Sequence, residues 1–290
     1  MKKHDYLEEP EVAAFVEWMR GKLRADSARG HGYARPRKQP LWFRNLADAF
    51  ALYAWRFNFL RLDGQRCSGM SFVESKAVLD GLQGRLRAAL DAGDDALVRD
   101  AAVEVVRWGG VAPHNEEWLR ANKNGLAALI GRVRAAIGKQ DDAADFGPHL
   151  RFNAGMTKVY SLLVDHFVIY DSRVAAALAW FVAAWETETG RGAVPGLLQF
   201  ACMDAKEAPQ AVRRKLRNPR TDTMHFPPLR NDPYVHMRWN LRASWIVEQL
   251  LETQPGTPFG TGPDASRKLE AALFMWGYDL TQPAPALRAA

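Results

Sequence analysis

A lysine and an aspartate, each at the expected start of a helix, are the residues of this chain with the most specific chemistry. After Lys158, a mostly apolar segment predicts a short helix that breaks near Asp165 and His166 and continues as an extended run over residues 167–170. Such a helix-loop-helix can return Asp171 close to Lys158. An amine facing a carboxylate can break an N-glycosidic bond, because the amine attacks the sugar carbon while the carboxylate handles protons and stabilises the cationic sugar.

Each of the two residues also has a simpler explanation. Aspartate is a good N-cap, so Asp171 could serve only to cap a helix that begins at Ser172. Lys158 could be a solvated lysine on a helix surface. A capping aspartate can also catalyse, so the structural and the catalytic interpretations of Asp171 are compatible.

The motifs around these residues resemble those of the helix-hairpin-helix DNA glycosylases, and most closely the 8-oxoguanine glycosylase branch. Met156-Thr157-Lys158-Val159 is similar to the Gly-Thr-Lys-Val type of sequence that ends the family's hairpin. Ile169-Tyr170-Asp171-Ser172-Arg173-Val174 is similar to the apolar-x-Asp-x-x-apolar motif that follows it. Asn153, Ala154 and Met156 stand where the family usually has proline or glycine.

The resemblance implies an all-α, helix-hairpin-helix glycosylase-like fold, in which helical subdomains flank a DNA- and base-binding cleft. The hairpin would lie near residues 149–163, and its Asn153 and Gly155 would contact DNA. Lys158 would be the nucleophile, and its Schiff base would allow strand cleavage as an AP lyase, while Asp171 stabilises the sugar cation. A monofunctional variant, in which water attacks and Lys158 helps electrostatically, stays open.

A late helical pattern adds a second point of resemblance. In the family's late helix a polar residue reads the flipped base and an aromatic residue four positions on stacks against it, and Glu270 and Phe274 have this spacing on one helix face. A carboxylate only accepts hydrogen bonds, so Glu270 suits the exocyclic amine of a cytosine. The alternative is an amphipathic helix with Phe274 in the core and Glu270 in a salt bridge.

Glu270 and the family resemblance point to two different substrates. One is a hypermodified, glucosylated hydroxymethyl cytosine of phage DNA, which would make the chain an anti-phage defence enzyme. The other, to which the nearest family resemblance points, is an oxidised purine, 8-oxoguanine, in DNA repair. In the turn-rich loop 107–115, the resemblance implies that His114 or Asn115 fills the gap left by the flipped nucleotide, and the alternative is a plain interhelical turn.

Basic residues gather in two places in a chain of formal charge +6 and pI about 9.4. Charge runs are usually solvated faces, but beside a glycosylase-like motif they favour contacts with the phosphates of double-stranded DNA. The first group is Arg20, Lys22, Arg24, Arg29, Arg35, Arg37, Lys38 and Arg44, and the second is Arg213, Arg214, Lys215, Arg217 and Arg220.

Two cysteines, Cys67 and Cys202, are too few for a disulfide framework or for the four-cysteine iron–sulfur cluster of some related glycosylases. We expect no cofactor, and no metal, since His225 and His236 are not at metal-ligand spacing with other candidates. A reducing cytoplasm fits this cysteine usage. The N-terminus does not read as a signal peptide, and the longest apolar run, 174–185, is too short to span a bilayer.

Helical periodicity recurs along nearly the whole chain, and no strand is predicted beyond the run 167–170. We expect an N-terminal helix from Pro10 with a basic connector (residues 1–40), then helical glycosylase-like domains over 41–290. The helices are predicted at 41–62, 72–90, 95–108, 116–137, 172–188, 206–216, 234–251 and 265–276, with connectors at 30–40, 218–233 and 253–264.

These observations favour a monomeric DNA glycosylase acting on duplex DNA with a modified base. Two other classes stay open: a DNA-binding module with the same fold but no activity, and an all-α protein-interaction subunit. Borohydride trapping on DNA would be absent from the first, and salt-dependent DNA affinity would argue against the second.

Overall fold

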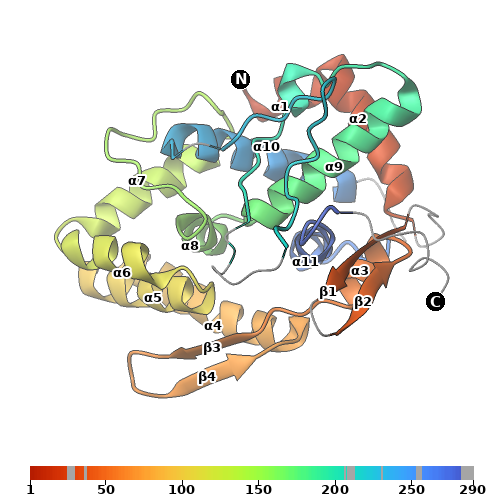
Figure 1. The fold of residues 1–290 in the computed structure, drawn as a ribbon. Helices are drawn as coiled ribbons and strands as arrows, with labels where there is room; N and C mark the ends of the chain where they lie inside the picture. Colours follow the sequence, from red (N-terminus) through yellow and green to blue (C-terminus); the bar gives the residue numbers. More distant parts are fainter. Residues whose placement is uncertain are drawn as a thin grey trace. The chain divides into compact units, whose positions relative to one another are not determined.

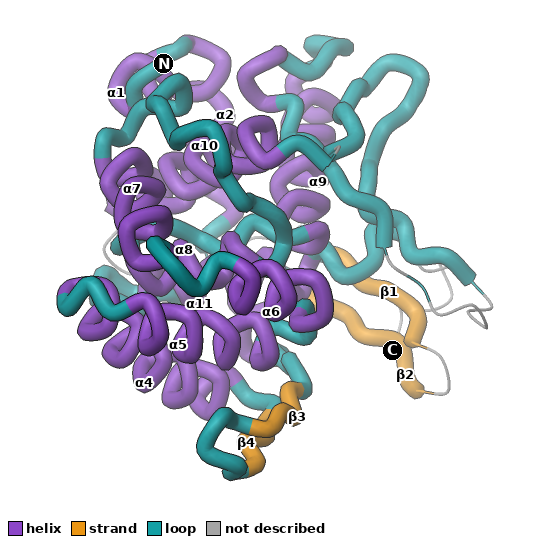
Figure 2. The backbone as a smooth tube through the Cα atoms, turned by 90° about the vertical axis from the view of Figure 1, so that its left-hand side faces the viewer, coloured by secondary structure: helices purple, strands orange, loops and turns teal. Residues whose placement is uncertain are grey.

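The chain folds into two compact units, described by a computed structural model that covers residues 1–24, 30–35, 38–205, 207, 213–229, 231–252 and 257–281. Helices predominate in both units, and in the described ranges the paired strands form two small hairpins (Figure 2). The first unit comprises Met1–Lys3, Ala54–Ile169 and Asn231–Leu241, and the second comprises His4–Tyr53, Tyr170–Arg230 and Arg242–Ala290.

The centre of the first unit is helix α5, Asp95–Trp108, which packs against its helices α4, α6, α7 and α8 and against strand β3 (Figure 1). Apolar side chains of α5 from Val98 to Trp108 are buried. The other elements are β3 (Phe57–Leu60), β4 (Arg66–Gly69), α4 (Phe72–Asp91), α6 (Ala112–Ala121), α7 (Leu126–Gly138), α8 (Met156–Leu163) and the first part of α10 (Pro233–Glu252), which continues into the second unit.

Side chains at the helix starts explain where these helices begin. Ser71 and Glu74 form a reciprocal capping box at α4, and Asp94 caps α5 by accepting hydrogen bonds from two backbone amides. The Asp95 carboxylate accepts hydrogen bonds from the amides of Gly125 and Ala127, at 2.6 and 2.8 Å, and so supports the start of α7 from α5.

The second unit is built around helix α11, Ala265–Trp276, which packs against α3 and α9. Its core includes the ring of His31, which lies among Tyr33, Trp180 and Trp276. The remaining elements are α1 (Lys3–Glu8), α2 (Pro10–Lys22), β1 (His31–Arg35), β2 (Lys38–Phe43), α3 (Leu46–Ala51), α9 (Ser172–Thr189) and η1 (Gly196–Leu198). Strands β1 and β2 pair antiparallel, with His31 opposite Phe43.

The fold is mainly α. The expectation of an all-α fold is wrong because the chain also forms two β-hairpins. The predicted connector 30–40 contains β1 and the start of β2, and the predicted helix 41–62 is replaced by the end of β2, α3 and β3. Asn45 caps α3, which ends at Ala51. In β3, buried and exposed residues alternate, but its outward residues include the apolar Leu60, which hides the two-residue period in the sequence.

The other helix predictions have mixed outcomes. Those at 72–90, 95–108, 172–188, 234–251 and 265–276 are confirmed by α4, α5, α9, α10 and α11. The predicted helix 116–137 is two helices, because the chain breaks before Gly125, whose φ is +81°. The run 167–170 is no strand. Of the predicted helix 206–216, residues 206 and 208–212 lie outside the described part, and 213–216 are not helical.

No helix in the described ranges is both long enough and apolar enough to cross a membrane.

Candidate active site

Lys158 lies in the first turn of α8, a helix whose residues are all buried. Its side chain is only 6% exposed, so the interpretation of Lys158 as a solvated surface lysine is wrong. The amine donates a hydrogen bond of 2.7 Å to the carbonyl oxygen of Ala154, just before the helix. A role of Lys158 as the nucleophile stays a prediction.

Three of the predicted DNA-contacting residues lie together in front of α8. The Asn153 side-chain oxygen accepts hydrogen bonds from the amides of Gly155 and Met156, at 2.8 and 3.0 Å, and its amide nitrogen donates to Asn115. Asn115 is 6% exposed and donates to the carbonyl of Val111. A Cβ on Gly155 would lie 2.1 Å from the Asn115 side-chain nitrogen, so this close approach requires glycine.

This asparagine pair ties the loop before α8 to helix α6. Residues 139–155, which connect α7 to α8, form turns and contain no helix. The predicted hairpin region near 149–163 therefore consists of a turn-rich segment followed by α8. A DNA contact through Asn115, Asn153 or Gly155 stays a prediction, as does one through His114, whose side chain is exposed on α6.

Asn240 of α10 is a buried polar residue that the sequence analysis did not single out. Its side-chain oxygen accepts a hydrogen bond of 2.5 Å from the hydroxyl of Thr157, and its side-chain nitrogen donates to the carbonyl of Val168 at 2.8 Å. Asn240 therefore links the residue beside Lys158 to the segment that leads to Asp171. Both partners are far from Asn240 in the sequence. No local sequence pattern therefore indicates these hydrogen bonds, which form only when the chain folds.

Asp171 caps helix α9 in the second unit, which confirms its predicted structural role. One carboxylate oxygen, Oδ1, accepts hydrogen bonds from the amides of Arg173 and Val174, at 2.9 and 3.2 Å. The second oxygen, Oδ2, takes no part in these capping hydrogen bonds. The preceding Tyr170 is buried and donates its hydroxyl hydrogen bond to the carbonyl of Ala201. The cap thus holds the carboxylate in place without using both of its oxygens.

Arg173 connects the start of α9 to the aromatic residues of α11. Its guanidinium carbon lies 4.1 Å from the ring centre of Phe274 and 4.8 Å from that of Tyr278. Burial lowers the pKa of Arg173, and the charge of Asp171 opposes this shift. A Cβ on Gly277 would lie 1.9 Å from the Arg173 carbonyl oxygen, so glycine permits the close packing here. The structure thereby brings Phe274 to the helix start that Asp171 caps.

Glu270 lies one turn before Phe274 on α11 and is 7% exposed. It forms an ion pair of 2.7 Å with Arg267 on the same helix. This is the salt bridge expected if the helix is simply amphipathic. A base-reading role for Glu270 and a stacking role for Phe274 stay predictions.

The second basic group is partly neutralised by acids of its own unit. Arg213 pairs with the buried Asp279, and Lys215 pairs with Glu207 at 2.6 Å, which lowers the pKa of the Glu207 carboxyl. Arg217 donates to the hydroxyl of Ser172. Arg214 is exposed and has no ion-pair partner among the residues that the structure describes. Of the three predicted phosphate-binding residues, Arg214 is therefore the one without an ion pair in the described part of the chain.

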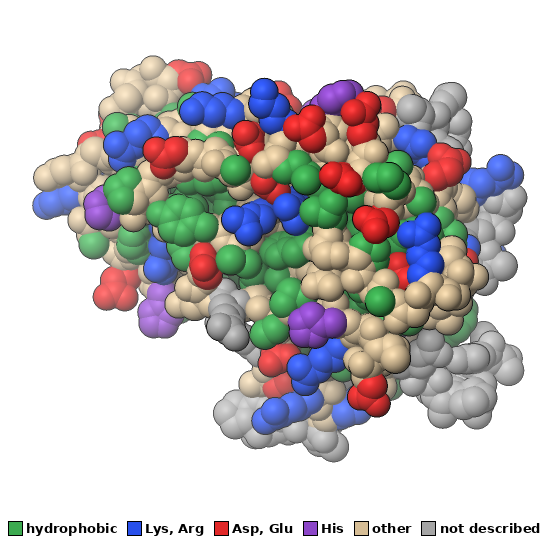
Figure 3. Space-filling view, turned by 90° about the horizontal axis from the view of Figure 1, so that it is seen from above, with side chains coloured by type: hydrophobic (Ala, Val, Ile, Leu, Met, Phe, Trp, Pro, Cys, Tyr) green, Lys and Arg blue, Asp and Glu red, His purple; other side chains and the backbone are tan. Residues whose placement is uncertain are grey.

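The first basic group is also partly neutralised by acids. Arg20 pairs with Glu17 at 2.8 Å and Arg44 with Asp48 at 2.6 Å, while Arg29 and Arg37 lie outside the described residues. On the face seen in Figure 3, basic and acidic side chains are interspersed. In both groups, some of the described basic side chains are therefore paired with acids.

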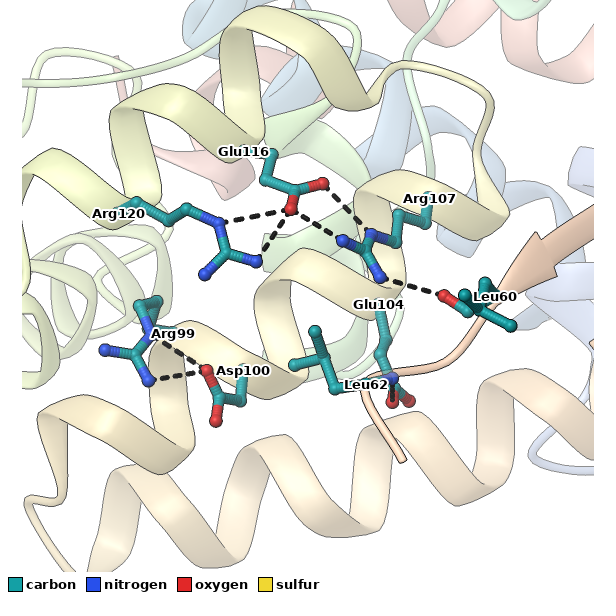
Figure 4. A network of polar contacts seen from close by, with 8 residues as sticks. All are labelled: Leu60, Leu62, Arg99, Asp100, Glu104, Arg107, Glu116 and Arg120. Carbon is teal, nitrogen blue, oxygen red and sulfur yellow. Dashed lines mark hydrogen bonds and ion pairs between the residues drawn. The ribbon is translucent and has the colours of Figure 1, made fainter. Parts of the chain in front are cut away.

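The loop between α5 and α6 is held by a network of ion pairs (Figure 4). Arg107 donates two hydrogen bonds to Glu116, at 2.7 and 3.0 Å, and one to the carbonyl of Leu60 at 2.9 Å. Arg120 binds the same carboxylate from the next turn of α6, at 2.8 Å. Arg107 holds the pKa of Glu116 below its usual value. This network fixes both ends of the loop that reaches toward Lys158.

Lys158 belongs to the first unit and Asp171 to the second. The pairing of the amine with the carboxylate therefore stays a prediction. Within the described residues, no three histidine, cysteine, aspartate or glutamate side chains are grouped so that they could hold a metal ion.

Comparison of the chain with models of protein families, with curated proteins and with solved structures finds no match.

Proposed function

We propose that this chain is a DNA glycosylase that extrudes a modified base from duplex DNA and cleaves its N-glycosidic bond. The observation that carries the proposal is the burial of the Lys158 amine at the start of α8, within the Thr-Lys-Val sequence. Lysine is rarely buried without a structural or chemical reason, and here its amine donates a hydrogen bond to the carbonyl of Ala154. Asp171 supports the proposal because its cap leaves one carboxylate oxygen for chemistry.

The proposed reaction begins with attack of the neutral Lys158 amine on C1′ of the nucleotide. The bond from C1′ to the base breaks, and the base leaves with the bonding electrons and takes up a proton. Loss of the amine proton and opening of the sugar ring give a Schiff base on Lys158, from which β-elimination cleaves the strand. Asp171 stabilises the positive charge that develops on the sugar. In the monofunctional variant, water attacks the same carbon.

Phe274 and Glu270 are the proposed base-binding residues. Phe274 already stacks against a cation, Arg173, and an extruded base requires a comparable π-face. A carboxylate that accepts from an exocyclic amine favours a cytosine-type base. We therefore propose hypermodified cytosine of phage DNA as the substrate and anti-phage defence as the role, with 8-oxoguanine repair as the alternative.

The test uses duplex DNAs that carry glucosylated hydroxymethyl cytosine, hydroxymethyl cytosine, 8-oxoguanine or no modification. We expect abasic sites in one modified duplex, and a covalent complex when borohydride is added. Lys158→Gln should abolish the covalent complex, because the amide is not nucleophilic. Lys139→Gln, at the exposed end of α7, makes the same change as a control and should trap like the wild type.

Two outcomes contradict parts of the proposal. Abasic sites without any trapping would restrict the chain to the monofunctional reaction. No abasic site in any duplex, with the protein folded, would leave a DNA-binding module or an interaction subunit, and salt-dependent DNA affinity distinguishes those two.

A further inference from the structure

Two adjacent glycines follow α5, and their backbone conformations differ. Gly110 has a φ of +65°, in the left-handed region that side chains rarely adopt, so its backbone explains why it is glycine. Gly109 has a φ of −74° and a ψ of −2°, a conformation open to most residues. The backbone therefore does not explain the glycine at position 109.

The Lys158 side chain explains it. A Cβ on Gly109 would lie 2.4 Å from Cδ and 2.7 Å from Cε of Lys158. Carbon atoms in contact are normally about 3.5–4.0 Å apart, so a side chain at position 109 and the present lysine conformation exclude each other. The last two methylene groups of the lysine thus occupy the space that a side chain on Gly109 would fill.

The loop that carries Gly109 is held on both sides. Arg107 is bound to Glu116 and to the Leu60 carbonyl (Figure 4). The indole of Trp55 donates a hydrogen bond of 3.3 Å to the carbonyl of Trp108. A larger residue at position 109 is therefore accommodated by movement of the flexible lysine stem rather than of the loop.

The start of α8 is also held, by Asn153, and the amine is bonded to Ala154. We propose that Gly109 is a positioning residue for Lys158: the absence of a side chain leaves the passage through which the lysine stem carries its amine to the site of attack. The role in catalysis rests on the proposed glycosylase function, whereas the contact between Gly109 and the lysine stem does not.

The catalytic part is tested with Gly109→Ala. We expect the single-turnover rate of Schiff-base formation to fall about 100-fold, because small misplacement of a reacting group has effects of this size. DNA affinity should stay unchanged, since the altered group acts after binding. Gly84→Ala, in α4 of the same unit, adds the same methyl group where nothing lies within 4 Å, and should react like the wild type.

The packing of the two residues is tested by thermal unfolding of Gly109→Ala, Lys158→Ala and the double variant. Lys158→Ala removes Cδ and Cε, so the decrease in unfolding midpoint caused by Gly109→Ala should shrink in that background. If Gly109→Ala alone unfolds, we expect the double variant to fold, because the lysine stem that the added methyl group would meet is absent.

The outcomes separate the two proposals. Equal decreases in both backgrounds would overturn the inference, whatever the activity. A normal trapping rate in Gly109→Ala would overturn its catalytic part. If the two positions are coupled but the wild-type protein forms neither abasic sites nor a trapped complex, the glycosylase proposal and the catalytic part are both refuted, while the packing of Gly109 on Lys158 stands.

Discussion

At the scale of single residues, the proposed chemistry depends on which polar atoms of Lys158 and Asp171 already take part in hydrogen bonds that hold the fold. The Lys158 amine has a backbone partner, and Asp171 uses one oxygen to cap α9. The substitutions Lys158→Gln and Asp171→Asn therefore distinguish a chemical role from a structural one. Glutamine and asparagine keep most of the shape of the original side chain but remove its amine or its negative charge.

Asp171→Asn should keep the α9 cap, since asparagine caps helices about as well as aspartate. It removes the negative charge that stabilises a sugar cation, so base excision should fall at least about 100-fold, the scale of removing one group that stabilises a transition state. The measurement is single-turnover excision together with the thermal unfolding midpoint, which should change little.

Asp94→Asn is the matched control for this prediction. Asp94 caps α5 through the same pattern of two backbone amides, at 2.9 Å each, but has no proposed part in catalysis. Excision should be normal in this variant. A similar decrease of excision in both variants, or near-normal excision by Asp171→Asn, would leave Asp171 as a structural cap alone.

At the scale of elements, the contacts between helices decide what each candidate functional group meets. The close packing of α11 on α9 at Gly277 sets Phe274 against Arg173. The segment 213–217 lies beside the same helices, with Arg217 on Ser172 and Arg213 on Asp279. Ion pairs within the unit thus decide which of the clustered cations can meet a polyanion.

Arg214→Gln should weaken binding to duplex DNA of any sequence. The slope of log affinity against log salt should become shallower by about 0.9 for each phosphate that the variant no longer neutralises. Lys215→Gln should reduce the slope less, because the Lys215 charge is already balanced by Glu207. DNA affinity measured over a series of salt concentrations gives the slopes for the wild type and both variants.

Arg132→Gln provides the comparison, since Arg132 is an exposed arginine of α7 outside both basic groups. Its slope should match that of the wild type. Equal slopes for Arg214→Gln and the wild type would mean that the second basic group is a solvated face.

At the scale of the whole molecule, stability depends on a core that contains a buried histidine. His31 is 2% exposed and lies against Trp276 and Trp180, and burial lowers its pKa to about 4, although a hydrogen bond with the Asp279 carbonyl opposes the shift. The unfolded chain takes up this proton near a pH of about 6.5. Between this pH and about 4 the unfolded state therefore binds more protons than the folded state.

The free energy of unfolding should consequently fall as the pH falls through this window, by about 3 kcal/mol from His31 at most. Above a pH of about 6.5 the contribution is complete and constant. His31→Phe should flatten this acid-side decrease in stability, as measured by denaturant unfolding at several pH values. His114→Phe, which alters an exposed histidine, should keep the wild-type pH dependence, and an equal dependence in all three proteins would contradict the assignment.

The sequence alone determined most of the helices, because their signals are local. Apolar residues at helical spacing predict the helices α5, α9 and α11, and the capping residue Asp171 predicts where α9 begins. The hairpins were not predicted, because an outward apolar residue, Leu60, masked the alternation in β3. Glycine, arginine and proline also gave the segment 30–40, which contains β1, the composition of a connector.

The sequence also singled out Lys158, Asp171 and Phe274 as candidates, but their surroundings depended on the tertiary structure. Burial of the Lys158 amine, the space left by Gly109, the support from Asn240 and the stacking of Arg173 on Phe274 all join residues far apart in the chain. Spacing along the chain indicates which face of a helix a residue occupies. Only packing decides what that face meets, because contacts between distant segments depend on how the elements fit together in space.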